Sequence, residues 1–592
     1  MEKFPAESPP SSPYLSIVAA SRNDDHGGDP LIRTQIFITN FSRQCEKFRL
    51  PAEIIIVDWN PVPGRPGLAA VLNLPSEVPF VRTRVVTVPT ALHQRLKYSE
   101  QLPLFQMIAK NVGIRRAKGQ FILATNIDIL FSDELIRFIA LQRLDTKKQY
   151  RVDRYDIQSG LTREASLDDA MNYAWSNPIR AHRRYCPERL LQHLYGDELF
   201  KNACIPDLNF CENQEGVAIV QEHGVWQVRP SRSVNMSHLH TNACGDFTLL
   251  SREGWEAIRG YPEFAAYSFN IDSMGLIAAH YAGYEEVSLL PPCVCFHIEH
   301  GIGSGWTPEG EKKLFNRLRD AGILNPEWPV LMPLVDEMRA KSKALEFNHA
   351  GWGMADFDLP EQAMGDTDAI PTDTLARLNV QAETRDVSAI QPTFDLDRLT
   401  LAYERRVAEE AQRKEREVED LAVRKYGLTV AANIEWVVLY LPDSEGYYSQ
   451  ERSIAYQANL ATMTTLVFHL AEFPCQFPLR LDPCQCPGLV SINSLTAFDT
   501  LNNKVVLELN GRDTHKLVAS GTAIWARTDS TKANVGKKML FSSKKLNGQQ
   551  SLHLVSTGLD PQLILPSLPE GTGFPLTLSV EMKVIPGKPL SA

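Results

Sequence analysis

Residues 53–58, EIIIVD, form an unbroken apolar run that ends in a carboxylate. Three similar runs lie on either side of it: YLSIVAA (14–20), TRVVTV (83–88) and QFILAT (120–125). Short continuous runs of this kind are typical of strands that are buried on both faces. Segments with apolar side chains at helical spacing alternate with them: 31–45, 104–117 and 133–144. The alternation predicts an α/β fold with a mainly parallel sheet that is covered by helices on both faces.

Polar residues follow three of these predicted strands. The sequences at these points are Ser21-Arg22-Asn23-Asp24, Asp58-Trp59-Asn60 and Asn126-Ile127-Asp128. Parallel sheets bind ligands at the carboxyl ends of their strands, so the three segments should share one polar rim. Asp58 can accept a hydrogen bond from a base or a ribose, with Trp59 offering a flat surface. Asn126 and Asp128, at i and i+2, can hold a hard divalent cation.

The composition indicates a large globular protein. With 592 residues, two or three domains are expected. Lys+Arg 61 against Asp+Glu 71 gives a net charge of −10 and a pI of about 5.8, which argues against a generic nucleic-acid binder. The N-terminus lacks the pattern of a signal peptide, and no apolar stretch is long enough to cross a bilayer. A cytoplasmic protein with free thiols is therefore expected.

The pattern changes along the chain and predicts four parts. Residues 14–355 form the α/β domain, within which 151–221 lacks periodicity and is interpreted as an acceptor-side insertion. Residues 356–395 are expected to be a linker. Residues 396–427 predict a charged connecting helix, which is a candidate for self-association into a homo-oligomer. Residues 430–590 have the short β-rich runs of a β-sandwich accessory domain.

The N-terminal motifs resemble those of the GT-A (Rossmann-like) glycosyltransferases of the family 2 type. The resemblance rests on the first strand, IIIVD and AKNVGIRRAKGQFILATNID at residues 109–128. It implies a D-x-D-like motif at Asn126 and Asp128 that binds Mn²⁺ or Mg²⁺ on the diphosphate of a nucleotide sugar. It further implies that the following residues bind this donor: Ser21, Arg22, Asn23, Asp24, Asp58, Lys110, Asn111 and Asn126.

A second block, HTNACGDF at residues 240–247, resembles the galactosyltransferase-type C-terminal segment of these enzymes. In that segment a G-D-F stretch lines the sugar site, and Asp246 occupies its acidic position. The later Asp272 matches the general base of inverting members, because the acceptor hydroxyl must lose a proton as it attacks. Asp272 fits a helix N-cap equally well.

The third block is His297-Ile298-Glu299-His300, after an apolar run at 293–296. A histidine after the last strand often completes the metal site of GT-A enzymes, so His297 and His300 are the expected further metal ligands. The Gly- and Trp-containing stretch 301–306 is a candidate for a loop that closes over the donor.

Together these features predict a metal-dependent, inverting glycosyltransferase with a UDP-sugar as donor and a glycan as acceptor. The β-rich C-terminus resembles accessory domains of bacterial polysaccharide-assembly enzymes, which implies a role in cell-surface polysaccharide synthesis, at most peripheral to the inner membrane. Three alternatives remain open from the residues: a sugar nucleotidyltransferase, a glycoside hydrolase that uses Asp246 and Asp272, and a non-catalytic carbohydrate-binding protein.

Overall fold

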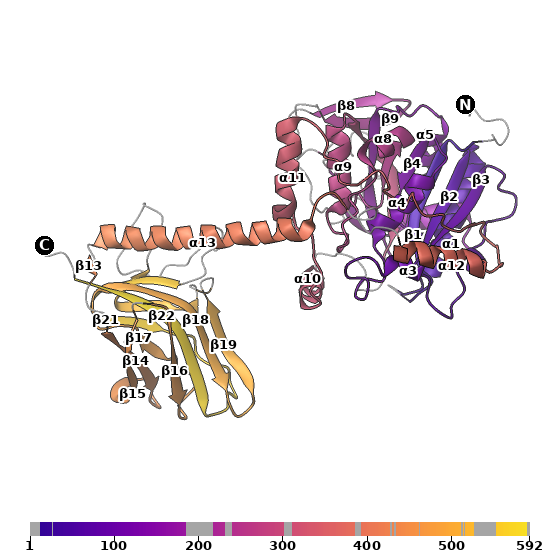
Figure 1. Cartoon of the computed structure of the whole chain (residues 1–592). Coiled ribbons are helices and arrows are strands. Elements are labelled where there is room, and N and C mark those ends of the chain that lie inside the picture. The colour runs from indigo at the N-terminus through magenta and orange to yellow at the C-terminus, as the bar shows by residue number, and fades with distance from the viewer. Residues whose placement is uncertain are drawn as a thin grey trace. The chain divides into compact units, whose positions relative to one another are not determined.

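The computed structural model describes residues 12–25, 28–184, 217–230, 239–300, 311–384, 392–426, 429–430, 434–460, 462–510, 513, 516–525 and 552–588. The chain divides into two compact units, residues 1–400 and residues 401–592 (Figure 1). Helix α13 (Leu396–Tyr426) runs through the boundary between them.

The first unit is built on one large mixed sheet with the strand order β12-β3-β2-β1-β4-β10-β6-β11-β9-β8. Its parallel half consists of four neighbouring strands: β3 (Val81–Val88), β2 (Ala52–Trp59), β1 (Leu15–Ser21) and β4 (Phe121–Ala124). Antiparallel β10 (Thr248–Ser251) joins β4 to β6 (Lys148–Ile157), and β6 pairs in parallel with β11 (Glu285–Ile298). The expected α/β class is confirmed, but the sheet is mixed rather than mainly parallel.

Smaller strands complete this sheet. They are β5 (Ile129–Phe131) and β9 (Val225–Pro230), which pair with β11; β7 (Pro178–His182), which pairs with β6; β8 (Val217–Glu222), which pairs with β9; and β12 (Glu361–Gln362), which pairs with β3. All these pairs are antiparallel. β5 and β7 lie beside the two strands, β6 and β11, that later supply the polar residues of the site.

Helices pack on both faces because the central strands are apolar on both. Leu15 and Ile17 of β1 share one core with α1 (Pro30–Phe48) and α5 (Asp133–Ala140). On the opposite face α4 (Gln106–Arg116) approaches so closely that a Cβ added at Gly113 would lie 2.5 Å from Val18. α5 begins where the Ser132 side chain accepts a hydrogen bond from the Leu135 amide.

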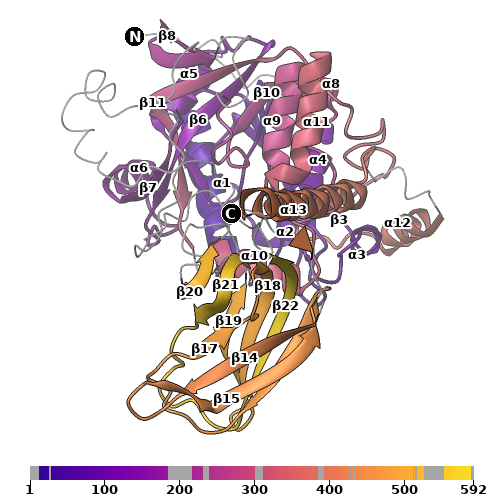
Figure 2. The same ribbon diagram turned by 90° about the vertical axis from the view of Figure 1, so that its left-hand side faces the viewer.

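The remaining helices of the first unit cover its second half and its rim. Figure 2 shows α8 (Arg252–Ile258), α9 (Ile271–Tyr281) and α11 (Trp328–Lys341) packed side by side. The others are α2 (Leu68–Val71), α3 (Thr90–His93), α6 (Leu167–Ser176), α10 (Glu311–Asp320) and α12 (Thr372–Thr384). α9 corresponds to the helix that the sequence predicts after Asp272.

Two segments differ from the sequence-based expectation. The stretch 151–221 is not wholly an insertion, because its first residues belong to β6 in the middle of the sheet. The segment 356–395 is not simply a linker, because Glu361 pairs with Val86 and Met364 packs into the main core. In both segments the chain is held by strand pairing with distant partners, which local composition does not reveal.

The second unit consists of antiparallel strands in a single hydrogen-bonded path, β13-β22-β18-β21-β17-β14-β15. β16 and β19 pair with β22 and β18, and β20 pairs with β21. The bounds are β13 (Thr429–Val430), β14 (Ile434–Pro442), β15 (Tyr448–Asn459), β16 (Thr464–Leu470), β17 (Arg480–Asp482), β18 (Gly488–Asp499), β19 (Lys504–Asn510), β20 (Val518–Trp525), β21 (Leu552–Ile564) and β22 (Leu576–Lys588). Their inward side chains form one apolar core that includes Val490, Phe468 and Leu578.

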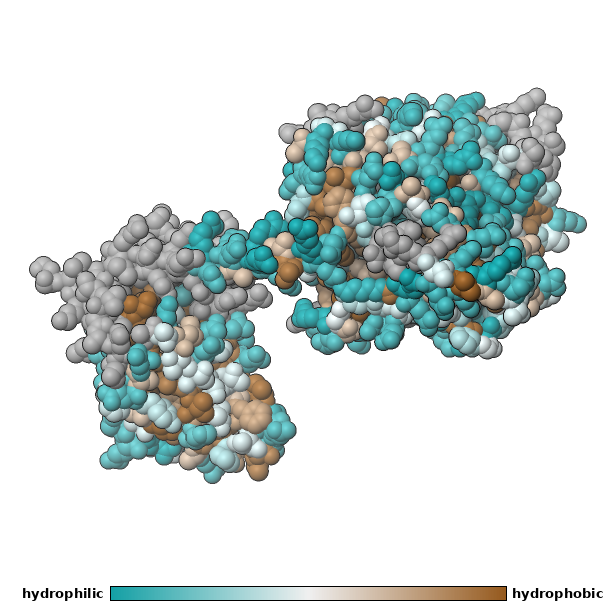
Figure 3. Space-filling model, viewed as in Figure 1, coloured by the Kyte–Doolittle hydropathy of each residue, from teal (hydrophilic) through white to brown (hydrophobic). Residues whose placement is uncertain are grey.

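Among the described residues, most of the large apolar side chains that are exposed belong to the second unit, where Leu501 is 70% exposed and Tyr447 68%. Figure 3 shows apolar surface on both units. No helix in the described part of the chain combines the length and the apolar character that a bilayer crossing requires. The described cysteines, among them Cys244 and Cys484, are free thiols.

Candidate active site

Three side chains of metal-ligand type meet near the carboxyl ends of β4 and β11. Asp128, His297 and His300 each offer one ligand atom, and these atoms all lie within 4.8 Å of one another. The Asp128 carboxylate lies 3.7 Å from Nε2 of His297 and 3.1 Å from Nε2 of His300, and its other oxygen, Oδ1, is buried without a hydrogen-bond partner. Two imidazoles and a carboxylate are a suitable donor set for a divalent transition metal. The residues present therefore fit the metal that the sequence predicts.

The sheet itself creates this cluster. β5 pairs His297 with Ile129, and the amide of Ile298 donates to the carbonyl of Asp128 over 2.9 Å. Burial would raise the pKa of Asp128, but His297 and His300 outweigh it and hold that pKa well below its usual range. The carboxylate is therefore ionised, and the two imidazoles have to release their protons before they can bind a metal ion.

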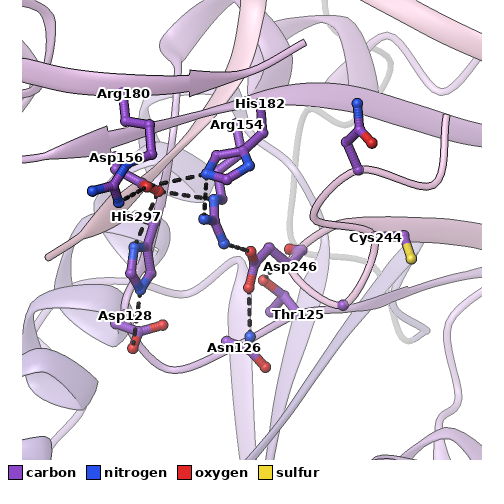
Figure 4. A network of polar contacts seen from close by, with 12 residues as sticks. Thr125, Asn126, Asp128, Arg154, Asp156, Arg180, His182, Cys244, Asp246 and His297 are labelled. Atoms are coloured by element: carbon purple, nitrogen blue, oxygen red, sulfur yellow. Dashed lines mark hydrogen bonds and ion pairs between the residues drawn. The ribbon is translucent and has the colours of Figure 1, made fainter. Parts of the chain in front are cut away.

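Behind the metal cluster lies a buried charged network that the sequence analysis did not identify (Figure 4). Strand register aligns Arg180 of β7, Asp156 of β6 and His297 of β11 in one cross-strand row. Asp156 lies 3.3 Å from Nδ1 of His297 and 2.9 Å from Nη1 of Arg180. Arg154 contacts the same carboxylate through Nε at 2.9 Å, and His182 contacts it at 3.1 Å.

Arg154 extends this network to Asp246, which lies two residues before the start of β10. Its Nη1 lies 2.5 Å from Asp246, whose other carboxylate oxygen accepts a hydrogen bond from the Asn126 side chain. Asn126 in turn accepts a hydrogen bond from Gln106 over 2.7 Å. The amide oxygen of Asn126 is thus engaged with Gln106, and its predicted role as a metal ligand stays a prediction.

A second polar cluster lies at the ends of β1 and β2, where Ser21 and Asp58 are register partners. Asp58 is 1% exposed; its Oδ2 accepts a hydrogen bond from the Leu68 amide over 2.8 Å, while its Oδ1 and the Ser21 hydroxyl have no partner. Burial raises the pKa of Asp58 to about 6. A buried acceptor without a partner is costly unless a ligand or water completes it, so this cluster fits a polar ligand.

Residues 22–24 stabilise the wall of that cluster. Arg22 donates to the Asn60 carbonyl over 2.6 Å and pairs with Asp24 at 3.3 Å, and Asn23 donates to the Pro66 carbonyl over 2.8 Å. Trp59 does not offer the expected flat surface. Its indole is fully buried and donates a hydrogen bond to Nδ1 of His93 over 3.0 Å, so this side chain points into the protein and not toward the rim.

The third cluster surrounds Asp272, which lies in the first turn of α9 and accepts the Ser273 amide over 2.8 Å. Burial raises the pKa of Asp272, and Lys110 acts in the opposite direction. Lys110 is fully buried and donates to the Gly245 carbonyl over 2.7 Å, and burial lowers its pKa to about 8. The charges of Asp246, Asp272 and Asp128 all act on Lys110, so this lysine lies behind the acidic groups of the site.

Asn111 is placed elsewhere than its predicted role suggests. Its side chain donates to the Tyr261 carbonyl and to Glu263, and it accepts a hydrogen bond from the Tyr261 amide. It is fully buried between α4 and the segment 260–263, so it holds this segment rather than lining the rim. The predicted loop 301–306 lies outside the described residues.

The residues that sequence reasoning missed are Arg154, Asp156, Arg180 and His182. Within KQYRVDRYDI, residues 148–157, charged residues flank Val152 at 151 and 153 and flank Tyr155 at 154 and 156. Each triplet has the period of two of a strand, with a change of phase between 153 and 154, and charged residues on a buried strand point to a polar site. This pattern could have identified β6.

Comparison with known proteins finds a likeness among solved structures but none among family models or curated proteins. No protein-family model matches the chain, and no curated protein matches it. Among solved structures, the mannosyltransferase PcManGT from Pyrobaculum calidifontis, determined with GDP-Man and Mn²⁺, is similar over 58% of this chain and 78% of its own, with 14% identity and a TM-score of 0.25. A likeness at this level does not assign an activity to the chain.

Proposed function

We propose that the first unit is a metal-dependent glycosyltransferase, which moves a sugar from a nucleotide-diphosphate donor to an acceptor hydroxyl. The observation that carries the proposal is the convergence of ligand-type groups at one edge of a mixed α/β sheet. The Asp128, His297 and His300 cluster follows β4 and β11, and the Ser21 and Asp58 cluster follows β1 and β2. Since β1 lies between β2 and β4, both clusters border the same edge.

Each cluster has a distinct task in this proposal. The unpartnered oxygens of Ser21 and Asp58 hold polar groups of the nucleoside, and residues 22–24 shape the wall. Asp128, His297 and His300 hold Mn²⁺ or Mg²⁺, which neutralises the leaving diphosphate when it is bound. Asp246, fixed between Arg154 and Asn126, orients the donor sugar or the acceptor.

Asp272 is proposed as the base that takes the proton from the attacking hydroxyl. Its position against Gly245, next to Asp246, supports this role. Burial raises the pKa of Asp272, which favours uptake of a proton, and the charge of Lys110 acts in the opposite direction. Direct attack assisted by one base inverts the anomeric centre.

The finer identity of the substrates is part of the proposal. A UDP-sugar donor and a glycan acceptor in cell-surface polysaccharide synthesis follow from the sequence resemblance. The solved mannosyltransferase binds GDP-Man, so a GDP-sugar belongs in the same test.

The experiment that tests this function is calorimetric titration of the full chain with UDP, GDP, ADP and CDP, in Mn²⁺ and then in EDTA. The corresponding nucleotide sugars are then incubated with the protein, and the released product is identified. We expect metal-dependent binding of one nucleotide and release of its diphosphate. Asp128→Ala should remove the metal dependence, whereas Asp145→Asn, half-exposed beside Lys148, is the matched control.

Other outcomes of this experiment distinguish the alternatives. Release of pyrophosphate would identify a sugar nucleotidyltransferase. If the folded protein binds no nucleotide with or without metal, the glycosyltransferase proposal is wrong, and a hydrolase or a carbohydrate-binding protein takes its place.

A further inference from the structure

A continuous line of charged contacts connects the metal cluster with the carboxylate of Asp246 (Figure 4). Asp246 lies 2.5 Å from Nη1 of Arg154, and Nε of Arg154 lies 2.9 Å from Asp156. Asp156 lies 3.3 Å from Nδ1 of His297, and Nε2 of His297 lies 3.7 Å from Asp128. Every member of this line belongs to a strand of the large sheet or to the residues that directly flank one.

The two ring nitrogens of His297 face opposite partners. Nδ1 lies 3.3 Å from Asp156, and in the neutral imidazole this negative charge favours the proton on Nδ1, which leaves the lone pair of Nε2 on the Asp128 side. A carboxylate behind a metal-binding histidine fixes its tautomer and its orientation, and removal of such a carboxylate usually costs 10- to 100-fold in metal affinity. Asp156, only 1% exposed at its side chain, has the position of this carboxylate.

Asp156 could instead be a ligand itself, because Asp156, His297 and Glu299 form a second group with metal-ligand spacing. Its oxygens, however, already face Arg154, Arg180 and His182 at 2.9 to 3.1 Å. Cations in these positions would repel a metal ion bound to the same carboxylate. The surroundings of Asp156 therefore favour an orienting role.

Arg154 fixes Asp156 from the side that faces Asp246. One guanidinium contacts both carboxylates, and its rigid planar set of N–H donors fixes the position of one carboxylate relative to the other. Its side chain is 15% exposed, so a carboxylate that lost this partner would stay largely buried without compensation. Arg180 also contacts Asp156, but it lies on the side away from Asp246 (Figure 4).

We propose that Arg154 and Asp156 are positioning residues which hold His297 in the orientation that binds the metal, and that Arg154 thereby joins the metal site to Asp246. This inference rests on the metal site of the proposed function. It adds two residues to that site and gives Arg154 a role that its charge alone would not predict. A positive charge near a cation site weakens cation binding by repulsion, so loss of Arg154 should strengthen metal binding unless Arg154 positions a ligand.

The test measures Mn²⁺ affinity of the full chain by electron paramagnetic resonance and calorimetry, without any nucleotide. Asp156→Asn is expected to weaken Mn²⁺ binding about 10- to 100-fold. Arg154→Gln is expected to weaken it as well, by at least about fivefold, although a positive charge is removed. Arg163→Gln is the control; it removes a positive charge on a side chain that is 64% exposed and pairs with Glu164, and its Mn²⁺ affinity should be unchanged.

A further variant and the melting temperature of each variant distinguish the loss of positioning from misfolding. Arg154→Lys keeps the charge but cannot span both carboxylates, so it should also weaken Mn²⁺ binding while melting close to the unchanged protein. If folded Arg154→Gln binds Mn²⁺ as tightly as the unchanged protein or more tightly, the positioning role is wrong. If the unchanged protein binds no Mn²⁺ at millimolar concentration, the metal site and this inference both fall. If Mn²⁺ binding responds as expected but no nucleotide binds, the inference stands and the glycosyltransferase proposal fails.

Discussion

The carboxylate of Asp272 packs against the backbone of Gly245, and a Cβ added at Gly245 would lie 2.9 Å from its Oδ2. Real Cβ atoms are essentially never found so close to another atom, so the glycine provides the space in which the carboxylate sits. The same residue accepts the hydrogen bond of Lys110 through its carbonyl. The position of the proposed base is thus set by a residue that carries no side chain.

Replacement of Asp272 tests its role as the base. Asp272→Asn should lower kcat by about 10²- to 10⁴-fold, because the acceptor hydroxyl would lose its proton acceptor. Donor affinity and melting temperature should change little, because Asn still accepts the Ser273 amide. Near-normal turnover by the folded variant would show that Asp272, which lies in the first turn of α9 rather than at its N-cap Asn270, only stabilises the start of that helix.

Gly245→Ala tests the same site without removing any functional group. The new methyl group should displace the Asp272 carboxylate and lower kcat by at least about tenfold, since small misplacements of catalytic groups are costly. Gly254→Ala provides a comparison, because its nearest neighbour at 3.0 Å is a carbon of the Tyr284 ring, outside the site. Equal kcat values for the two variants would contradict this account of Gly245.

The donor set of the metal cluster predicts which metal binds. Two imidazoles and one carboxylate favour a transition metal over Mg²⁺, which prefers oxygen ligands. Mn²⁺ should therefore bind at least about tenfold more tightly than Mg²⁺ in calorimetric titrations. His297→Gln should weaken Mn²⁺ binding and reduce this preference. Equal affinity for both metals in the unchanged protein would indicate that the histidines are not ligands.

Asp58 predicts how nucleotide binding depends on pH. Burial raises its pKa to about 6 in the free protein, and an ionised Asp58 is needed to accept a hydrogen bond from the nucleoside. Binding should therefore be constant above about pH 7 and weaken as the pH falls through 6, up to tenfold per unit below it. Asp58→Asn should bind more weakly and lose this step. Parallel pH profiles for both proteins would contradict the assignment.

Glu263 predicts a pH dependence of stability away from the site. Burial raises the pKa of Glu263 to about 7, so the folded protein holds this proton at pH values where the unfolded chain releases it. The stabilisation is complete below pH 4.5 and is lost as the pH rises to 7. Glu263→Gln should remove this loss. Relative to the unchanged protein, its free energy of unfolding should therefore be up to about 3 kcal/mol higher at pH 8 than at pH 4. Urea unfolding at both pH values measures it.

A matched variant checks that this gain belongs to the buried carboxyl. Glu253→Gln removes the charge of a side chain that is 76% exposed. It should change the free energy of unfolding only slightly, and by the same amount at both pH values. A gain of the same size for Glu253→Gln would assign the effect to net charge instead.

Much of the first half of the sheet was predictable. The expected strands at 14–20, 53–58, 83–88 and 120–125 coincide with β1 to β4 within a few residues, and the helices expected at 31–45, 104–117 and 133–144 are present as α1, α4 and α5. The apolar residues of each element form a recognisable pattern within a short stretch of sequence, so that stretch alone predicts that the element is buried. The strand β6 was not predicted, because alternating charged residues hide its apolar side.

The sequence by itself determined the α/β class and nominated Asp128, His297 and His300, which are brought together in the folded chain. Only the tertiary structure decided that Asp156 and Arg154 lie behind this cluster, that Trp59 is buried, and that Asn111 holds the segment at 260–263. The apolar pattern of a segment predicts whether that strand or helix is buried, and it depends only on residues that are near one another in the chain. The partners of a buried polar group, in contrast, are set by strand register and packing between residues far apart in the chain, and these arise only when the whole sheet has formed.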